Sequence, residues 1–93
     1  MLRISEHKRE NQLITLKLEG SVVGPWVGEL RQVCDLLLAD GSKFALDLGD
    51  VSFADESGLA LLASFNRRGA QLLLPTPFVS EQLKTAGLEI PKV

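Results

Sequence analysis

Two short stretches near the start of the chain alternate between apolar and polar residues. The first runs from Leu2 to Glu6 and the second from Gln12 to Gly20. Alternation with a period of two residues is typical of a β-strand that buries one face. The polar residues between them, His7 to Asn11, predict a turn. The two stretches are therefore expected to pair as an antiparallel hairpin.

Apolar residues recur at helical spacing in three later segments, which predicts three helices. Proline suits the first helical position, and glycine suits the left-handed residue that follows many helices. The first helix is expected to begin at Gly24-Pro25 and to end at Asp40-Gly41. The second follows Asp55 and ends before Gly69. The third begins at Thr76-Pro77 and ends at Gly87, with Val79, Leu83 and Ala86 facing inward.

Two more strands are expected between the helices. Residues Lys43 to Leu48 alternate again, with Phe44, Leu46 and Leu48 on one face. The stretch from Gly49 to Ala54 is rich in turn-forming residues and predicts a loop. Ala70 to Leu74 predicts a short fourth strand, and residues 88–93 form a tail.

The resulting order of elements is β-β-α-β-α-β-α. Strand–helix–strand units imply parallel strands joined by right-handed crossovers. A parallel sheet covered on both faces would have nearly continuous apolar strands, and Lys17 and Asp47 would be costly on a covered face. The predicted fold class is therefore α/β, a mixed β-sheet with its helices packed mainly on one face.

The length of the chain indicates the number of domains, and its charge argues against nucleic-acid binding. The chain has 93 residues, which predicts a single domain over residues 1–93. Its net charge is −2, and it lacks the clustered basic surface that nucleic-acid binding requires. No apolar run approaches the ~20 residues of a membrane helix, so direct membrane insertion is not expected. The start of the chain lacks the long apolar stretch of a signal peptide, which favours a cytoplasmic protein.

Residues with catalytic or metal-binding chemistry are few. The single cysteine, Cys34, lies at an apolar helical position and is interpreted as a small buried hydrophobe. The single histidine, His7, falls in the predicted surface turn without clustered partners. The chain has no phosphate-binding loop, dinucleotide fingerprint or nucleophile elbow. We therefore expect no enzymatic activity, no catalytic residue and no cofactor.

Four acidic residues lie around the predicted loop before the second helix: Asp47, Asp50, Asp55 and Glu56. Such a group is conceivable as a site for Mg²⁺, but its spacing matches no known ligand loop. A turn explains Asp50, and a helix N-terminus explains Asp55 and Glu56. No metal is therefore expected. Arg67-Arg68 is interpreted as a solvated helix end, which suits the negative end of the helix dipole.

The most specific motif spans residues 46–62, Leu-Asp-Leu-Gly-Asp-Val-Ser-Phe-Ala-Asp-Glu-Ser-Gly-Leu-Ala-Leu-Leu. It resembles the STAS family, the domain of bacterial anti-sigma-factor antagonists and of sulphate-transporter tails. That family has a strand ending in Asp-Leu, a short loop, and Asp-Ser-Ser-Gly-Leu at the start of a helix. Residues Val79 to Leu88 also look like the last helix of that family. The resemblance covers essentially the whole chain and implies the STAS fold.

The resemblance implies a regulatory module that acts through protein–protein contacts. In the antagonist branch, a partner serine kinase, itself the anti-sigma factor, phosphorylates the first serine after the aspartate. The unphosphorylated domain binds this kinase and frees the sigma factor. The corresponding regulatory loop here is Asp55, Glu56, Ser57 and Gly58. Added charge at a helix start would weaken such a contact by repulsion and desolvation.

This sequence departs from the family pattern at the phosphoacceptor, where Glu56 replaces the first serine. Three interpretations follow: a domain locked in a phosphorylated-like state, a domain that has lost the switch, or a surface that binds another partner. Glutamate is also favourable at a helix N-terminus for purely local reasons. Ser57 matches the second serine of the pattern. Its hydroxyl could be phosphorylated or could cap the helix.

The resemblance also supports an alternative function. Standalone STAS-like subunits serve ATP-binding cassette (ABC) transporters that move phospholipids, including toluene-tolerance systems, in bacterial envelopes. The stretch from Gly58 to Leu62 is similar to that branch, and the missing phosphoacceptor fits it. The partner would then be the ATPase subunit of the transporter.

Overall fold

A computed structural model of the chain describes residues 1–87, in which seven elements follow the predicted order. The predicted tail, residues 88–93, lies outside the described residues. The elements are β1 (Leu2–Glu10), β2 (Leu13–Val22), α1 (Pro25–Ala39), β3 (Lys43–Ala54), α2 (Glu56–Arg67), β4 (Gln71–Leu73) and α3 (Pro77–Thr85).

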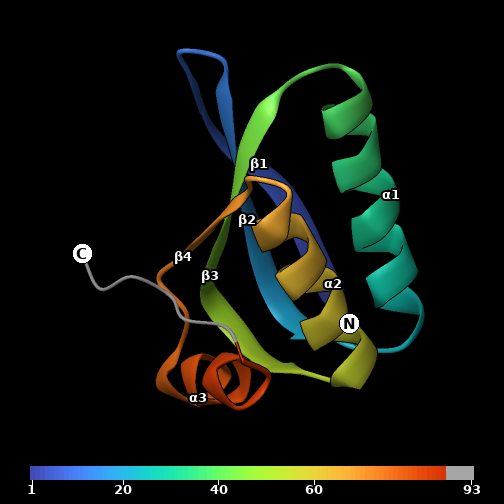
Figure 1. Cartoon of the computed structure of the whole chain (residues 1–93), viewed down its shortest axis with the longest axis vertical. Helices are drawn as coiled ribbons and strands as arrows, with labels where there is room; N and C mark the ends of the chain where they lie inside the picture. Colours follow the sequence, from blue (N-terminus) through green and yellow to red (C-terminus); the bar gives the residue numbers. More distant parts are fainter. Residues whose placement is uncertain (88–93) are drawn as a thin grey trace.

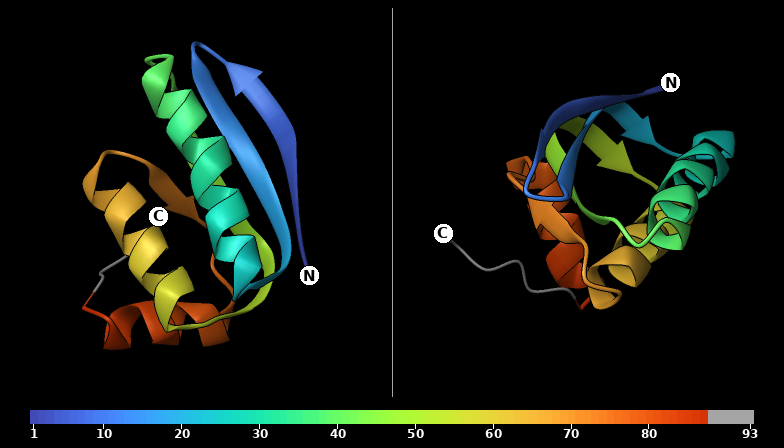
Figure 2. Two further views of the ribbon diagram at one scale, coloured as in Figure 1. Left: turned by 90° about the vertical axis from the view of Figure 1, so that its right-hand side faces the viewer. Right: turned by 90° about the horizontal axis from the view of Figure 1, so that it is seen from above.

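The four strands form one mixed sheet in the order β1-β2-β3-β4. β1 and β2 are antiparallel, whereas β2 with β3 and β3 with β4 are parallel. The two crossover helices, α1 and α2, lie side by side on one face of the sheet, and α3 lies beside the end of β3 and the start of α2 (Figures 1 and 2). The predicted α/β fold class, with helices mainly on one face, is confirmed.

The core lies between the sheet and its two crossover helices. Alternate residues of β2 and β3 supply the sheet side of the core, as their period of two predicts. The Phe44 ring of β3 meets the Phe65 ring of α2 edge to face, with centroids 5.7 Å apart. The period-two run of buried residues comprises Ile14, Leu16 and Leu18 of β2 and Phe44, Leu46 and Leu48 of β3. The other buried strand residues are Leu2, Val22, Ala45, Val51, Ala54 and Leu72.

The other face of the sheet carries the polar residues of the same strands. Lys17 of β2 is paired in register with Asp47 of β3. Its ammonium lies 3.0 Å from the Asp50 carboxylate, which raises the pKa of Lys17. These charges remain in contact with solvent, as the alternation of the strands predicts.

The predicted loop from Gly49 to Ala54 is wrong, because β3 continues through it to Ala54. This extension pairs in parallel with residues 19–22 of β2, which satisfies its backbone groups. The register shifts twice along the pairing, so the buried residues Val51 and Ala54 are three positions apart. The alternation of buried and exposed residues is broken there, and Gly49-Asp50 is a residue pair typical of turns, although it lies within β3.

The predicted turn from His7 to Asn11 is also wrong. β1 continues to Glu10, and the turn consists of Asn11 and Gln12 alone. His7 therefore lies in a strand, where it is exposed. The pairing with β2 is irregular between Glu6 and Lys8, and an irregularity of this kind interrupts the alternation that marks a strand.

The third helix and the fourth strand differ from prediction at their ends. Val79 and Leu83 are buried as predicted, but Ala86 is exposed because α3 ends at Thr85 and Ala86 is only its C-cap. β4 covers three residues rather than the predicted five. Leu74 leaves the strand with a positive φ of 50° and is 74% exposed. Among residues 1–87, no helix has the length and apolar character needed to cross a bilayer.

The hairpin turn allows a test of local strain. Asn11 and Gln12 have φ values of 49° and 67°, and a two-residue hairpin with two positive φ values favours glycine at the second position. Gln12→Gly should raise the free energy of unfolding by about 0.5 kcal/mol, because relief of strain exceeds the added entropy of the unfolded chain. Urea denaturation measures the change. Gln12→Ala is the control and should give no gain; a lower stability for the glycine variant would contradict this interpretation.

Candidate functional site at the start of α2

The carboxylate of Asp55 organises the junction between β3 and α2. It is the N-cap of α2, and its Oδ1 accepts hydrogen bonds from the Gly58 amide at 2.8 Å and the Ser57 hydroxyl at 2.9 Å. Its Oδ2 accepts a bond from the Gly24 amide, at the start of α1, at 2.9 Å. One side chain thus ties together the N-termini of the two helices that cover the sheet.

These donors also fix the charge of the site. Three hydrogen bonds lower the pKa of the Asp55 carboxyl below its ordinary value of 3.8. The bond from the Gly24 amide has the largest effect, followed by those from the Gly58 amide and the Ser57 hydroxyl. Hydrogen bonds to the charged form of an acid favour that form. Asp55 is therefore ionised at neutral pH, and its negative charge lies at the positive end of the α2 dipole.

Gly58 allows α2 to begin close to the end of β2. A Cβ atom built at Gly58 would overlap the Val22 carbonyl oxygen and would lie 3.1 Å from Val22 Cγ1 and 3.2 Å from Asp55 Oδ1. The Val22 carbonyl also accepts the amide of Asp55 at 3.1 Å. Only glycine fits this approach without a shift, so Gly58 has a structural role in the predicted regulatory loop.

Glu56 and Ser57 occupy the outer surface of the junction, and both are exposed. Glu56 is the first residue of α2, and it has no ion-pair partner within residues 1–87. The Ser57 hydroxyl donates to the Asp55 carboxylate instead of accepting a backbone amide. The predicted capping role of Ser57 is therefore wrong, because Asp55 already provides the cap.

The third helix fastens the junction from the other side. The side-chain amide of Gln82 accepts the Ala54 amide at 3.2 Å and donates to the Ala54 carbonyl at 2.8 Å. It thereby pairs with both backbone groups of the residue immediately before Asp55. Nothing in the sequence identifies Gln82, because a glutamine on a short amphipathic helix gives no signal of such a contact.

An exposed aromatic pair lies beside this contact. Phe53 is 41% exposed and Phe78 is 58% exposed, and their ring centroids are 6.1 Å apart. Phe53 precedes Asp55 by two residues, and Phe78 lies one helical turn before Gln82. Exposed aromatic residues are enriched at protein interfaces, so this pair extends the candidate interaction surface. Sequence analysis missed it, because Phe53 was assigned to a loop.

The acidic residues considered for a cation are engaged separately. Asp47 accepts the Gly49 amide at 2.9 Å, Asp50 pairs with Lys17, and Asp55 caps α2. Within residues 1–87, no three His, Cys, Asp or Glu side chains are grouped as metal ligands. Asp50 lies in β3, so its predicted assignment to a turn is wrong. The helix N-terminal positions of Asp55 and Glu56 are confirmed.

Cys34 and Arg68 have structural roles on the helical layer. Cys34 is fully buried in α1, and this burial raises the pKa of its thiol to about 12, which confirms its interpretation as a small hydrophobe. Arg68 is more than the predicted solvated helix end. Its guanidinium lies 3.6 Å from the Asp35 carboxylate of α1 and 5.7 Å from the centroid of the Phe65 ring.

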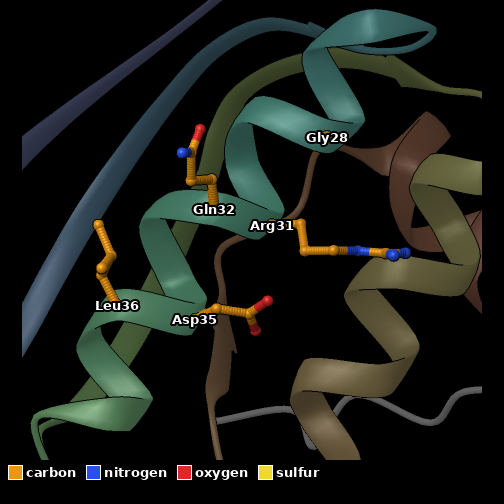
Figure 3. A pocket seen from close by; sticks show the side chains of 5 residues that line it. All are labelled: Gly28, Arg31, Gln32, Asp35 and Leu36. Carbon is orange, nitrogen blue, oxygen red and sulfur yellow. The ribbon is translucent and has the colours of Figure 1, made fainter.

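A shallow pocket of about 410 Å³ also lies on the outer side of α1. Arg31 and Asp35 extend from α1 toward α2, whereas Gln32 and Leu36 extend away from it (Figure 3). None of the junction residues lines this pocket. It is therefore separate from the candidate site.

A search of solved structures finds the same fold in the unphosphorylated form of the anti-sigma factor antagonist SpoIIAA. The match has a TM-score of 0.73 and 18% sequence identity, and it covers 98% of this chain and 89% of the other. No protein-family model matches the sequence, and no curated protein matches it. The chain therefore has the SpoIIAA-like fold, an α/β fold with a four-stranded mixed sheet and three helices.

The close approach at Gly58 gives the first test of the site. Gly58→Ala should lower the free energy of unfolding by about 1–3 kcal/mol, because the added methyl group must displace the Val22 backbone. Gly28→Ala is a matched control on α1, where nothing lies within 4 Å of the added carbon. This control should be stabilised by about 0.5–1 kcal/mol, as expected for alanine in a helix. Urea denaturation measures both free energies of unfolding, and an equal change in the two variants would contradict the close packing at Gly58.

The lowered pKa of Asp55 predicts how stability depends on pH. A carboxyl whose pKa is lowered by folding stabilises the folded state above its unfolded pKa, and this stabilisation is lost as pH falls through the folded pKa. The melting temperature of Asp55→Asn should therefore be lower than that of the wild type at pH 7. The difference should shrink as pH falls below about 4. Thermal melts between pH 3 and pH 7 measure it, and a difference that does not vary with pH would exclude this role of the ionised carboxylate.

Proposed function

We propose that this protein is a non-enzymatic regulator of the anti-sigma-factor-antagonist type, and a member of the STAS family. Its partner is a cytoplasmic serine kinase that acts as the anti-sigma factor, or a related switch protein. The observation that carries the proposal is the exposed Glu56 on the first turn of α2, held in place by the Asp55 cap. The STAS resemblance puts the phosphoacceptor serine at this position.

The geometry of the junction supports a rigid docking surface. Asp55 is held by three donors, and Ala54 is held by both atoms of the Gln82 amide. Groups fixed in this way lose little conformational entropy when a partner binds. The outer side chains, Glu56 and Ser57, then meet the partner together with the Phe53–Phe78 pair.

Glu56 determines how this surface is regulated. Its carboxylate places about one negative charge where a phosphoserine would carry about −1.5 to −2. The kinase cannot add phosphate at this position, so the partner meets a permanently charged surface. Among the three interpretations, we favour a domain held in a phosphorylated-like state, because Glu56 is unpaired by any cation within residues 1–87.

Ser57 is the only hydroxyl among the regulatory-loop residues Asp55, Glu56, Ser57 and Gly58, and we propose that it is not the regulatory switch. Its oxygen lies 2.9 Å from Asp55 Oδ1. A phosphate on this oxygen would bring two negative groups together and would compete with the cap of α2. The Asp55–Ser57 contact therefore opposes phosphorylation at Ser57.

A second candidate function is an accessory subunit of a bacterial ABC transporter for phospholipids. The lack of a hydroxyl at Glu56 favours it, because such a subunit needs no phosphorylation switch. The same junction would then contact the ATPase subunit. Stable co-purification with an ATPase, and with no serine kinase, would favour this function over the first.

Replacement of Glu56 tests the proposed function. Glu56→Ser should bind the serine kinases of the same genome at least tenfold more tightly than the wild type, because a charge is removed from the contact. When ATP is added, the kinase should phosphorylate residue 56 of the variant, and the tighter binding should then be lost. Its stability should stay within about 0.5 kcal/mol of the wild type, since the site is exposed.

Glu29→Ser is the matched control, because it removes one exposed acid from the early part of α1. It should bind as the wild type does. Surface plasmon resonance gives the affinities, and mass spectrometry gives the site of phosphorylation. If no kinase binds either the wild type or Glu56→Ser, the antagonist function is wrong.

A further inference from the structure

A groove of about 580 Å³ runs between α2 and α3 and begins at Glu56. On α2 it is lined by a row of residues on one face, and on α3 by the last turn of the helix and its C-cap. The lining residues that matter here are Glu56, Leu59, Ala60, Ala63, Arg67, Gln82 and Thr85.

The α2 wall has a defined order of charge and size. Glu56 and Arg67 are eleven positions apart, which corresponds to three helical turns and about 16 Å along one face. Leu59, Ala60 and Ala63 lie between them; Ala60 is exposed, Leu59 is half-buried and Ala63 is buried. A wall with a carboxylate at one end, a guanidinium at the other and an apolar strip between them can receive the apolar face of an amphipathic helix.

We propose that this groove binds an amphipathic α-helix of a partner protein, antiparallel to α2. The partner helix carries apolar residues against Leu59 and Ala60. An acidic residue in its first turns pairs with Arg67, and a basic residue eleven positions later pairs with Glu56. This proposal goes beyond the proposed function, because the partner helix recognises the charged Glu56 surface that weakens binding of the kinase.

The charges select the orientation of the partner helix. Acidic residues stabilise the N-terminal turn of a helix, and basic residues stabilise its C-terminal turn. An antiparallel partner brings its N-terminus to Arg67 and its C-terminus to Glu56. Its own stabilising charges then face opposite charges on α2. A parallel helix would need a basic N-terminus and an acidic C-terminus, which oppose its own dipole.

Display of a random library of helical peptides tests the proposal directly. Peptides of about 15 residues span three turns with a margin at each end. They are selected on the full-length protein and counter-selected on Ala60→Trp, whose indole fills the groove from an exposed position. Enriched peptides should carry an acid, a base eleven positions later, and apolar residues at helical spacing between them.

Charge reversal then tests the pairing. For a selected peptide, Arg67→Glu should raise the Kd at least tenfold, and a peptide with its acid changed to lysine should recover most of this loss. Lys43→Glu is the matched control, because it reverses one exposed cation on β3 and should leave the Kd unchanged. Fluorescence anisotropy gives the Kd, and circular dichroism of each variant confirms its fold.

Three results would overturn the proposal: no enrichment over Ala60→Trp, enriched peptides without the spaced acid and base, or enriched peptides that match residues 88–93 of this chain. A dimer of the wild type that Ala60→Trp dissociates would identify a second copy as the occupant, and would also overturn it. Kinase binding by the wild type in the absence of peptide enrichment would leave the proposed function standing while the groove proposal fails.

Discussion

The hydrogen bonds of the Asp55 carboxylate hold together the junction between β3 and the starts of α1 and α2. One oxygen caps α2, and the other binds the backbone of Gly24 where α1 begins. Both helices cover the same face of the sheet, so this single charge fixes their starts relative to each other. The exposed residues that follow, Glu56 and Ser57, are held in a fixed position because they belong to the first turn of the capped helix. Loss of this carboxylate would loosen the junction without removing either of these exposed side chains.

Each remaining support of the junction comes from a different part of the chain. β2 contributes the Val22 carbonyl, against which only glycine fits at position 58. α3 contributes the Gln82 amide, which pairs with both backbone groups of Ala54. These contacts are made by backbone atoms or by side chains that face inward. The outer surface is therefore free to vary in charge, and the residue at position 56 can differ without a change of fold.

The sequence predicts the order of the elements and the inward faces of β2 and β3 because period-two alternation and helix end signals are local. It fails where non-local pairing decides the outcome. The stretch from Gly49 to Ala54 contains turn formers, yet parallel pairing with β2 keeps it extended. The irregular pairing between Glu6 and Lys8 interrupts the alternation of β1, so the sequence does not show that this strand continues to Glu10. At the site, the position of Glu56 follows from the motif, whereas the Gln82 contact and the Phe53–Phe78 pair depend on where α3 packs.

We propose that a partner kinase binds the surface at the start of α2, with residue 56 at its centre, and that the Glu56 carboxylate weakens this binding in the wild type. Nuclear magnetic resonance of the ¹⁵N-labelled Glu56→Ser variant, titrated with that kinase, shows which residues form the contact. The largest amide shifts and line broadening should fall on residues 53–60, with smaller changes of the same residues in the wild type, and the β1–β2 hairpin should stay unchanged. Changes confined to the hairpin or to the outer side of α1, with residues 53–60 unaffected, would contradict it.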